Sequence, residues 1–153
     1  MTREERISLA HNSSTPPDVL AELSRDKAKT VRRCVAGNPS TPPEVLAELS
    51  RDGNSTVRCN VAGNLSTPPE VLAEVLAELS RDEDSGIRCE VARNTSTPPE
   101  VLTQLSRDED RDVRLRVAEN LSTPLEVLLI LMVDDKEDVR EEVEVALSRR
   151  MTP

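Results

Sequence analysis

Cysteine and histidine are the residue types in this chain that could bind a metal or carry redox chemistry. The three cysteines, Cys34, Cys59 and Cys89, lie 25 and 30 residues apart, and His11 is the sole histidine. A structural zinc site needs four such ligands, and an iron–sulfur cluster needs four thiolates held close together. We therefore expect no metal and no other cofactor. An odd number of scattered cysteines also indicates reduced thiols rather than a disulfide framework.

Carboxylates are the second candidate for chemistry, because general acid–base catalysis often uses a pair of them. The chain has 29 Asp and Glu residues, and they recur at equivalent places along it, whereas a catalytic pair would occur once. We find no nucleophile–base pair, no phosphate-binding loop and no metal motif. The sequence therefore predicts no catalytic residues and a protein that is not an enzyme.

Aspartate and arginine recur together at a fixed distance. A column of like charges is tolerable only where opposite charges lie between its members. We interpret these residues as a structural ladder between units rather than as a ligand-binding row of arginines. In each case the Asp precedes the Arg by six residues: Asp26 and Arg32, Asp52 and Arg58, Asp82 and Arg88, Asp108 and Arg114, and Asp134 and Arg140.

Other markers show that the chain is built from repeats. The tripeptide Ser-Thr-Pro begins at positions 14, 40, 66, 96 and 122, and an Asn lies two residues before each copy. Periods of 20–50 residues are typical of solenoids and other repeat arrays. We expect a single repeat domain over residues 1–153, with an opening half unit (1–12) and repeats at about 13–38, 39–64, 65–94, 95–120 and 121–150.

The first half of each unit has the signals of a helix start. In Thr41-Pro42-Pro43-Glu44, Thr41 can cap the first amides and Glu44 can complete a capping box. Prolines in a first turn lose no hydrogen bond. We expect the same caps at Thr15…Asp18, Thr67…Glu70, Thr97…Glu100 and Thr123…Glu126.

The second half of each unit is predicted to be a shorter helix. Val57, Val61 and Ala62 share one apolar face, and Gly63-Asn64 is typical of a left-handed helix end. Since about two turns remain after two connections, we expect this element to be short and either α or partly 3₁₀.

One such unit cannot be stable alone. Its core residues contribute about 1.5–3 kcal/mol each, whereas ordering the backbone costs roughly 1–2 kcal/mol per residue. Stacking buries both sides of every unit and closes this gap. The expected fold class is therefore all-α, an α-solenoid of short two-helix repeats.

The motif Val-Arg-x-x-Val-Ala followed by Thr-Pro-Pro-Glu-Val-Leu, as at residues 57–62 and 67–72, resembles the leucine-rich repeat variant family. The resemblance covers nearly the whole chain and implies a right-handed superhelix of alternating α-helices and 3₁₀-like helices. The Asp and Arg columns resemble HEAT repeats, and a longer second helix would make the array more HEAT-like. The family is also associated with a cysteine-rich iron–sulfur module, which the three scattered cysteines do not match.

The third unit departs from the pattern by a duplicated Glu-Val-Leu-Ala quartet at residues 70–77. Four residues add about one turn and rotate the apolar stripe by only some 40°, so we expect a longer helix with an intact stripe. The duplication is either a tolerated replication slip or a ridge at a binding surface.

The last unit is unusually apolar. Leu129, Ile130, Met132 and Val133 stand where earlier units have Ala, Thr, Glu, Gln, Ser or Arg. The outer side of an end unit should become more polar, so these residues indicate a covered surface and form our candidate interaction surface. Either a closing helix from Asp138 to Arg150 folds over them, or a second chain does.

Composition limits the class of partner. The formal net charge is −9, and there is no Phe, Tyr or Trp. An acidic protein without stacking side chains is a poor match for nucleic acid and favours a protein partner with a basic patch. The longest apolar run, residues 127–133, is far short of the roughly 20 residues that span a bilayer, and no signal peptide follows Met1. We expect no membrane partner and a cytoplasmic location.

The resulting hypothesis is a non-catalytic scaffold for protein–protein interaction. It would bind another protein, or a second copy of itself, through its solenoid surface or its apolar C-terminal repeat. Two alternatives remain open: a HEAT-like accessory subunit of a lyase-type enzyme, and a truncated array with no dedicated partner.

Overall fold

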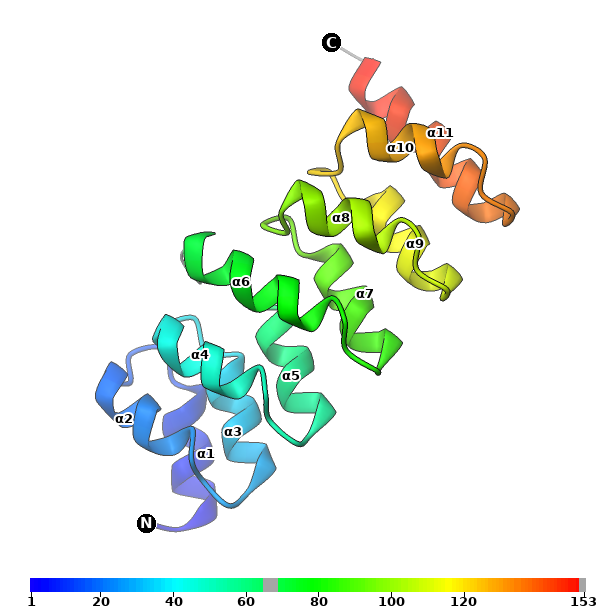
Figure 1. Ribbon diagram of the computed structural model, residues 1–153. Helices are drawn as coiled ribbons and strands as arrows, with labels where there is room; N and C mark the ends of the chain where they lie inside the picture. The colour runs from blue at the N-terminus through cyan, green and yellow to red at the C-terminus, as the bar shows by residue number, and fades with distance from the viewer. Residues whose placement is uncertain (65–68, 152–153) are drawn as a thin grey trace.

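The computed structural model describes residues 1–64 and 69–151. For residues 69–72 it describes the backbone and not the side chains. Within these ranges the chain is helical and has no strand (Figure 1). The helices are α1 (Arg3–His11), α2 (Pro17–Leu23), α3 (Lys29–Ala36), α4 (Pro43–Leu49), α5 (Ser55–Ala62), α6 (Pro69–Leu79), α7 (Ser85–Arg93), α8 (Pro99–Leu105), α9 (Arg111–Glu119), α10 (Leu125–Leu131) and α11 (Glu137–Met151).

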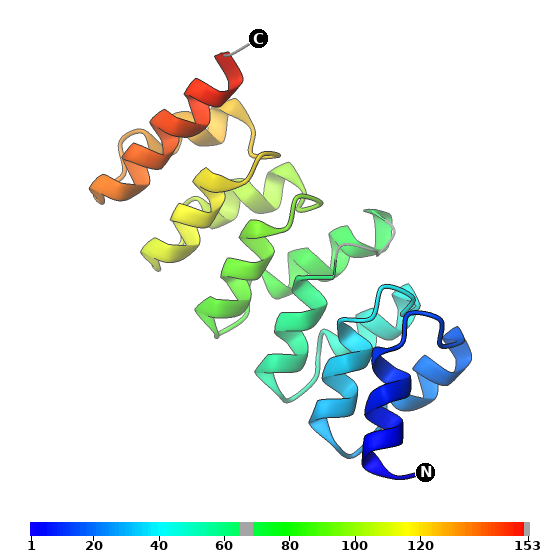
Figure 2. The same ribbon diagram turned by 180° about the vertical axis from the view of Figure 1, so that it is seen from behind.

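The helices form two rows in an open stack. The even-numbered helices are the first helices of the units and form one row, and the odd-numbered helices are the second helices and form the other (Figures 1 and 2). Each second helix packs against the second helices of its neighbouring units and against first helices. The two termini lie at opposite ends of the stack. The all-helical solenoid expected from the sequence is confirmed.

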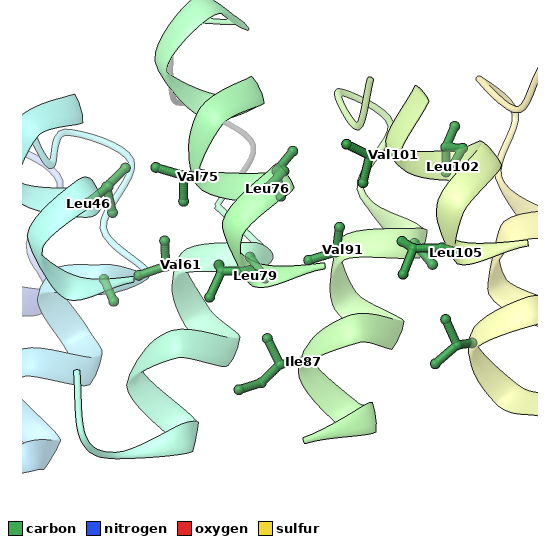
Figure 3. Close-up of a cluster of buried hydrophobic side chains, with 14 of the residues drawn as sticks. Leu46, Val61, Val75, Leu76, Leu79, Ile87, Val91, Val101, Leu102 and Leu105 are labelled. Atoms are coloured by element: carbon green, nitrogen blue, oxygen red, sulfur yellow. The ribbon is translucent and has the colours of Figure 1, made fainter. Parts of the chain in front are cut away.

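The core is a continuous apolar layer between the two rows. In the second unit, Val45, Leu46 and Leu49 from the first helix meet Val57 and Val61 from the second, and each of the five is at most 4% exposed. Figure 3 shows the equivalent side chains of successive units pointing into this layer. Each unit is therefore covered on both sides by its neighbours, except at the ends.

The second helix of each unit is α-helical, one of the two forms left open by the sequence, but outside the third unit it is not the shorter helix of the pair as expected. It is an α-helix of eight residues in α3 and α5 and of nine in α7 and α9, whereas α2, α4, α8 and α10 have seven. Val57 and Val61 are four residues apart and both fully buried. In a 3₁₀-helix they would point about 120° apart, so only α geometry buries both. The units are thus HEAT-like pairs of α-helices.

The predicted capping boxes at the first helices are wrong. Pro42 is the N-cap of α4, Pro43 its first helical residue, and no side chain caps this end. Thr41 instead donates its hydroxyl hydrogen bond backwards, to the carbonyl oxygen of Val35 at 2.5 Å. Thr15, Thr97 and Thr123 do the same to the carbonyls six residues earlier. Proline needs no N–H partner, so threonine is free to close the end of the preceding helix. The expected cap Thr67…Glu70 lies outside the described residues.

The left-handed stop expected at Gly63-Asn64 is also wrong. Gly63 ends α5 with φ −83°, and no described residue has a positive φ. The helix end is closed by side chains instead. At Gly37, which ends α3, an added Cβ would lie 3.2 Å from the side-chain nitrogen Nδ2 of Asn60. The absence of a side chain at Gly37 therefore allows Asn60 of the next unit to approach closely.

The repeating asparagine joins consecutive units. The side-chain amide of Asn120 donates to the carbonyl oxygens of Ala92 at 2.6 Å and Asn94 at 3.0 Å, and its own oxygen accepts from the amide of Ser122 at 2.8 Å. Asn38, Asn64 and Asn94 also donate to carbonyls of the preceding unit. All four are at most 6% exposed. The backbone of one unit therefore depends on the next unit for its hydrogen bonds.

The duplicated quartet lengthens one helix without disturbing its neighbours. The helix α6 has eleven residues, and Val75, Leu76 and Leu79 are buried at the places of Val45, Leu46 and Leu49. The expected longer helix is confirmed, whereas the part of the expected stripe at residues 71 and 72 lies outside the described side chains. Figure 1 shows α6 as the longest helix of its row.

We predict that Asn120→Ala lowers the free energy of unfolding by about 2–4 kcal/mol, because buried carbonyls and one amide lose their partner. Asn12→Ala is the matched control, since the side-chain oxygen of the exposed Asn12 accepts from the amide of Ser14 and its removal should cost less than about 1 kcal/mol. Urea unfolding followed by circular dichroism measures both. Equal losses for the two variants would contradict the role of the asparagine column.

Candidate interaction site

The Asp and Arg columns form ion pairs between units. Arg88 donates from Nε to Asp108 Oδ2 at 2.7 Å and from Nη2 to Asp108 Oδ1 at 2.9 Å, while its Nη1 donates to the carbonyl oxygen of Asp82 at 2.9 Å. Each arginine thus binds the backbone of its own unit and the carboxylate of the next. The pairs are Arg6–Asp26, Arg32–Asp52, Arg58–Asp82, Arg88–Asp108 and Arg114–Asp134.

These pairs are partly shielded from water. The carboxylate side chains are 6–10% exposed and those of the arginines 10–28%. Burial favours a raised pKa for Asp82, but the hydrogen bonds from Arg58 and from the amide of Asp84 hold the pKa below its ordinary value. The pKa of Asp134 is lowered chiefly by the hydrogen bond from Arg114. Because each guanidinium and each carboxylate in these pairs is already hydrogen-bonded, the paired residues of the ladder are not available to bind a ligand.

The two ends of the ladder differ from the sequence prediction. The prediction did not include Arg6, and it included Arg140 as a paired member. Arg6 pairs with Asp26 although no Asp precedes it by six residues. At the other end, Arg140 donates from Nη1 to the carbonyl oxygen of Asp134 at 2.6 Å, as the other arginines do to theirs. In the part of the chain that the structure describes, Arg140 makes no ion pair. The C-terminal end of the ladder is therefore open.

A second set of ion pairs runs along the outer side of the first helices. Arg25 pairs with Glu48 of the next unit at 3.3 Å, and Arg51 pairs with Glu78 at 2.8 Å. At the place of these glutamates the following units carry Gln104 and Ile130. The polar outer column therefore ends before the last unit.

The terminal apolar surface, defined as Leu129, Ile130, Met132 and Val133, is open to solvent. These side chains are 53%, 36%, 45% and 83% exposed, respectively. Of the two alternatives for their cover, the closing helix is therefore wrong. That helix, α11, packs against α9 and α10 on the core side, as every second helix does, and leaves the outer side of α10 bare.

The structure adds Leu125, which is 51% exposed, to this end of the molecule. Leu125, Leu129 and Met132 are spaced i, i+4 and i+7 and therefore share a face of the helix. Sequence reasoning missed Leu125, although the change from Thr-Pro-Pro-Glu to Thr-Pro-Leu-Glu at residues 123–126 carried the signal.

The cysteines are half-buried against the core and free of disulfides. Burial, aided by the carboxylates of Asp110 and Asp112, raises the pKa of the Cys89 thiol to about 11, and burial also raises the pKa of Cys59. Both thiols are thus protonated at neutral pH and act as packing groups. Among the described residues, no group of three or more His, Cys, Asp or Glu side chains is arranged to hold a metal ion. None of the described helices is both long and apolar enough to cross a bilayer.

Comparison with known proteins bears on the family. The leucine rich repeat variant model matches residues 30–54 and 86–110. A solved leucine-rich repeat variant, described as having a novel repetitive structural motif, is 28% identical, with a TM-score of 0.72 over 95% of this chain. The chain spans 56% of that protein's length. The resemblance drawn from the sequence motifs is therefore confirmed.

Two engineered proteins share the fold. One is 24% identical with a TM-score of 0.58 over 95% of this chain and 88% of its own, and the other is 21% identical with a TM-score of 0.59 over 97% and 90%. No curated protein matches the sequence.

We predict that Arg88→Met lowers the free energy of unfolding by about 3 kcal/mol, because the carboxylate of Asp108 is left buried without its partner. Arg25→Met is the control, since its ion pair with Glu48 is exposed and worth less than about 1 kcal/mol. Urea unfolding of both variants tests this, and a loss for Arg88→Met no greater than for Arg25→Met would contradict it.

The ladder also predicts a pH dependence. Because Asp52, Asp82 and Asp134 have lower pKa values in the folded protein than the ordinary value of about 3.9, they stabilise the fold above that pH and lose this effect as the pH falls through the folded pKa values. The free energy of unfolding should be level from pH 7 to about 5 and fall below it. Asp82→Asn should show a shallower fall between about pH 5 and 2, and an unchanged slope would count against the ladder.

Proposed function

We propose that the protein is a non-catalytic repeat scaffold that binds another protein through the terminal apolar surface. The observation that carries this proposal is the exposure of four large apolar side chains, two on α10 and two directly after it, where the interior units have small or polar ones. Exposed apolar patches of this kind mark interaction sites in soluble proteins.

The contrast between the two ends of the stack supports the proposal. At the N-terminal end, the exposed positions of α1 include Arg3, Glu4, Glu5 and Ser8, as expected of an end that faces water. At the C-terminal end, the exposed positions of α10 are Leu125, Glu126, Leu129 and Ile130. The exposed positions of α10 are thus more apolar than those of α1.

The size of the surface indicates what a partner must add. Full burial of such a side chain contributes about 1.5–3 kcal/mol, so covering four half-exposed ones contributes roughly 3–6 kcal/mol. Association costs an estimated 4–15 kcal/mol in lost freedom. A stable complex therefore needs further contacts, and because the protein is acidic, contacts outside the patch favour a basic surface.

The non-catalytic part of the proposal rests on how the acidic residues are used. The repeating aspartates are engaged in the ladder or in helix caps, such as Asp84 accepting from Gly86 and Asp110 from Asp112. A repeated structural role explains these carboxylates without a reaction.

A photo-crosslinking amino acid at position 129 of the full chain, in its cells of origin, tests the proposal. We predict a reproducible cross-link to a second polypeptide that disappears when Met132→Glu is added, since a carboxylate in the interface would stay unpaired. The control is the same amino acid at position 103, the equivalent half-buried site of the preceding unit. Identical products at both positions, or none at 129 in folded protein, would refute the proposal.

A further inference from the structure

The solvent side of the second helices changes its charge along the stack. The helices α3, α5 and α7 lie side by side and pack directly against one another (Figure 2). On this side α3 carries Lys29 and Arg33, whereas α5 has Ser55 and Cys59 at the same places. The only charged residue of α5 is Arg58, which belongs to the ladder. The surface therefore changes from basic to neutral within one unit.

A basic hollow of about 230 Å³ lies between α3 and α5. It is lined by Lys29, Thr30, Arg33 and Thr56, which include two cations and no carboxylate. Neither Lys29 nor Arg33 makes an ion pair with any residue that the structure describes. Arg3 of α1 donates to the hydroxyl oxygen of Thr30 at 3.1 Å and adds a third positive charge nearby. In a chain of net charge −9, these cations are available to an anionic group.

An acidic hollow of about 270 Å³ lies next to it, between α5 and α7. Its lining includes Thr56 and Cys59 from α5, and Asp84, Gly86 and Glu90 from the N-cap and body of α7. Because Thr56 lines both hollows, they are direct neighbours on the same side of the stack.

The charge of the second hollow is negative. Burial, followed by the carboxylates of Glu90 and Asp84, raises the pKa of the Cys59 thiol. Glu90 pairs with Arg93 of its own helix at 3.0 Å, whereas Asp84 has no cationic partner in the described part of the chain. A Cβ at Gly86 would lie 3.0 Å from Asp84 Oδ1, so the glycine leaves room beside this carboxylate. The acidic hollow therefore suits one cationic group.

We propose that the two hollows bind an extended segment of a partner protein, with an acidic side chain in the basic hollow and a lysine or arginine in the acidic one. Packed α-helices lie about 8–10 Å apart. A polyproline II segment has three residues per turn and rises about 3.1 Å per residue, so residues i and i+3 point the same way about 9 Å apart. The bound segment therefore has its acidic and basic residues three positions apart. This site lies on the second helices and does not depend on the terminal apolar surface.

Other occupants match the two hollows less well. Both hollows are open on one side, whereas a small molecule is commonly buried over 70–90% of its surface. A partner α-helix docks through apolar anchors, and the lining of the basic hollow is polar throughout. A β-strand places side chains i and i+2 about 7 Å apart, which is shorter than the spacing of the helices. A nucleic acid is repelled by the net charge.

The test titrates the isotope-labelled full chain with the capped peptide Ala-Asp-Pro-Pro-Lys-Ala and follows the backbone amide signals by NMR. We expect signals of residues 29–33, 55–59 and 84–90 to shift, and the binding to weaken as salt is added. The matched peptide Ala-Asp-Pro-Lys-Pro-Ala has the same composition with the charges two positions apart. Its Kd should be roughly 3- to 10-fold weaker, because only one charge can reach its hollow.

Variants of the chain can copy residues from the same places in other units. Arg33→Leu copies Leu115 and Asp84→Asn copies Asn54, so both should stay folded, which circular dichroism checks. Each should weaken binding by roughly 3- to 10-fold. Reversing both charges of the basic hollow, with Lys29→Glu and Arg33→Glu, should abolish binding of the first peptide and permit binding of Ala-Lys-Pro-Pro-Lys-Ala.

The control variant is Arg107→Leu, which removes an exposed cation after the first helix α8 and should leave the Kd unchanged. Met132→Glu in the terminal apolar surface should also leave it unchanged. Equal Kd values for the two spacings, equal losses for Arg33→Leu and Arg107→Leu, or shifted signals outside these three helices would each overturn the proposal. Equal shifts from a mixture of capped aspartate and capped lysine would overturn it as well, because linking the two charges would then add nothing.

Discussion

The hydrogen bonds that cross from one unit to the next are the constraint on which the rest of the structure depends. The carbonyls that end one second helix are satisfied by the asparagine of the following unit, and the arginine of one unit is satisfied by the aspartate of the next. The apolar layer supplies the larger part of the stabilisation, but apolar contacts have no direction. The directional bonds fix the register at which successive layers meet, and they leave every unit incomplete until both neighbours are present.

Much of the fold follows from the sequence because the same few residues recur. The period, the two helices of each unit and the longer α6 could all be predicted, since apolar spacing at i, i+4 and i+5 determines the buried face. The helix ends could not. Thr41 has the appearance of a cap, and only the three-dimensional position of the Val35 carbonyl shows that its hydroxyl serves the previous helix. Asn120 is equally visible in the sequence, but its role depends on carbonyls 26 and 28 residues away.

The terminal apolar surface could be identified from the sequence because Leu129 and Met132 break a pattern seen four times before. Its exposure could not, because the direction in which α11 packs is a property of the stack. The unpaired edge of Arg140 could not be predicted either, because the six-residue spacing shows which Asp and Arg share a unit and not which Asp of another unit each Arg binds. The true partner lies 20 residues onward, or 24 across the longer α6.

The lengthened α6 shows how an array of this type can vary in evolution. Copying twelve nucleotides adds four residues, which turn a helix by about 400° and return the apolar stripe almost to its starting direction. Copying nine or fifteen nucleotides would rotate it by about 60° backward or 140° forward and bury polar residues. The pitch of the α-helix therefore determines which short duplications a first helix tolerates. The four-residue duplication lengthens α6, and Arg58 still binds Asp82 across it.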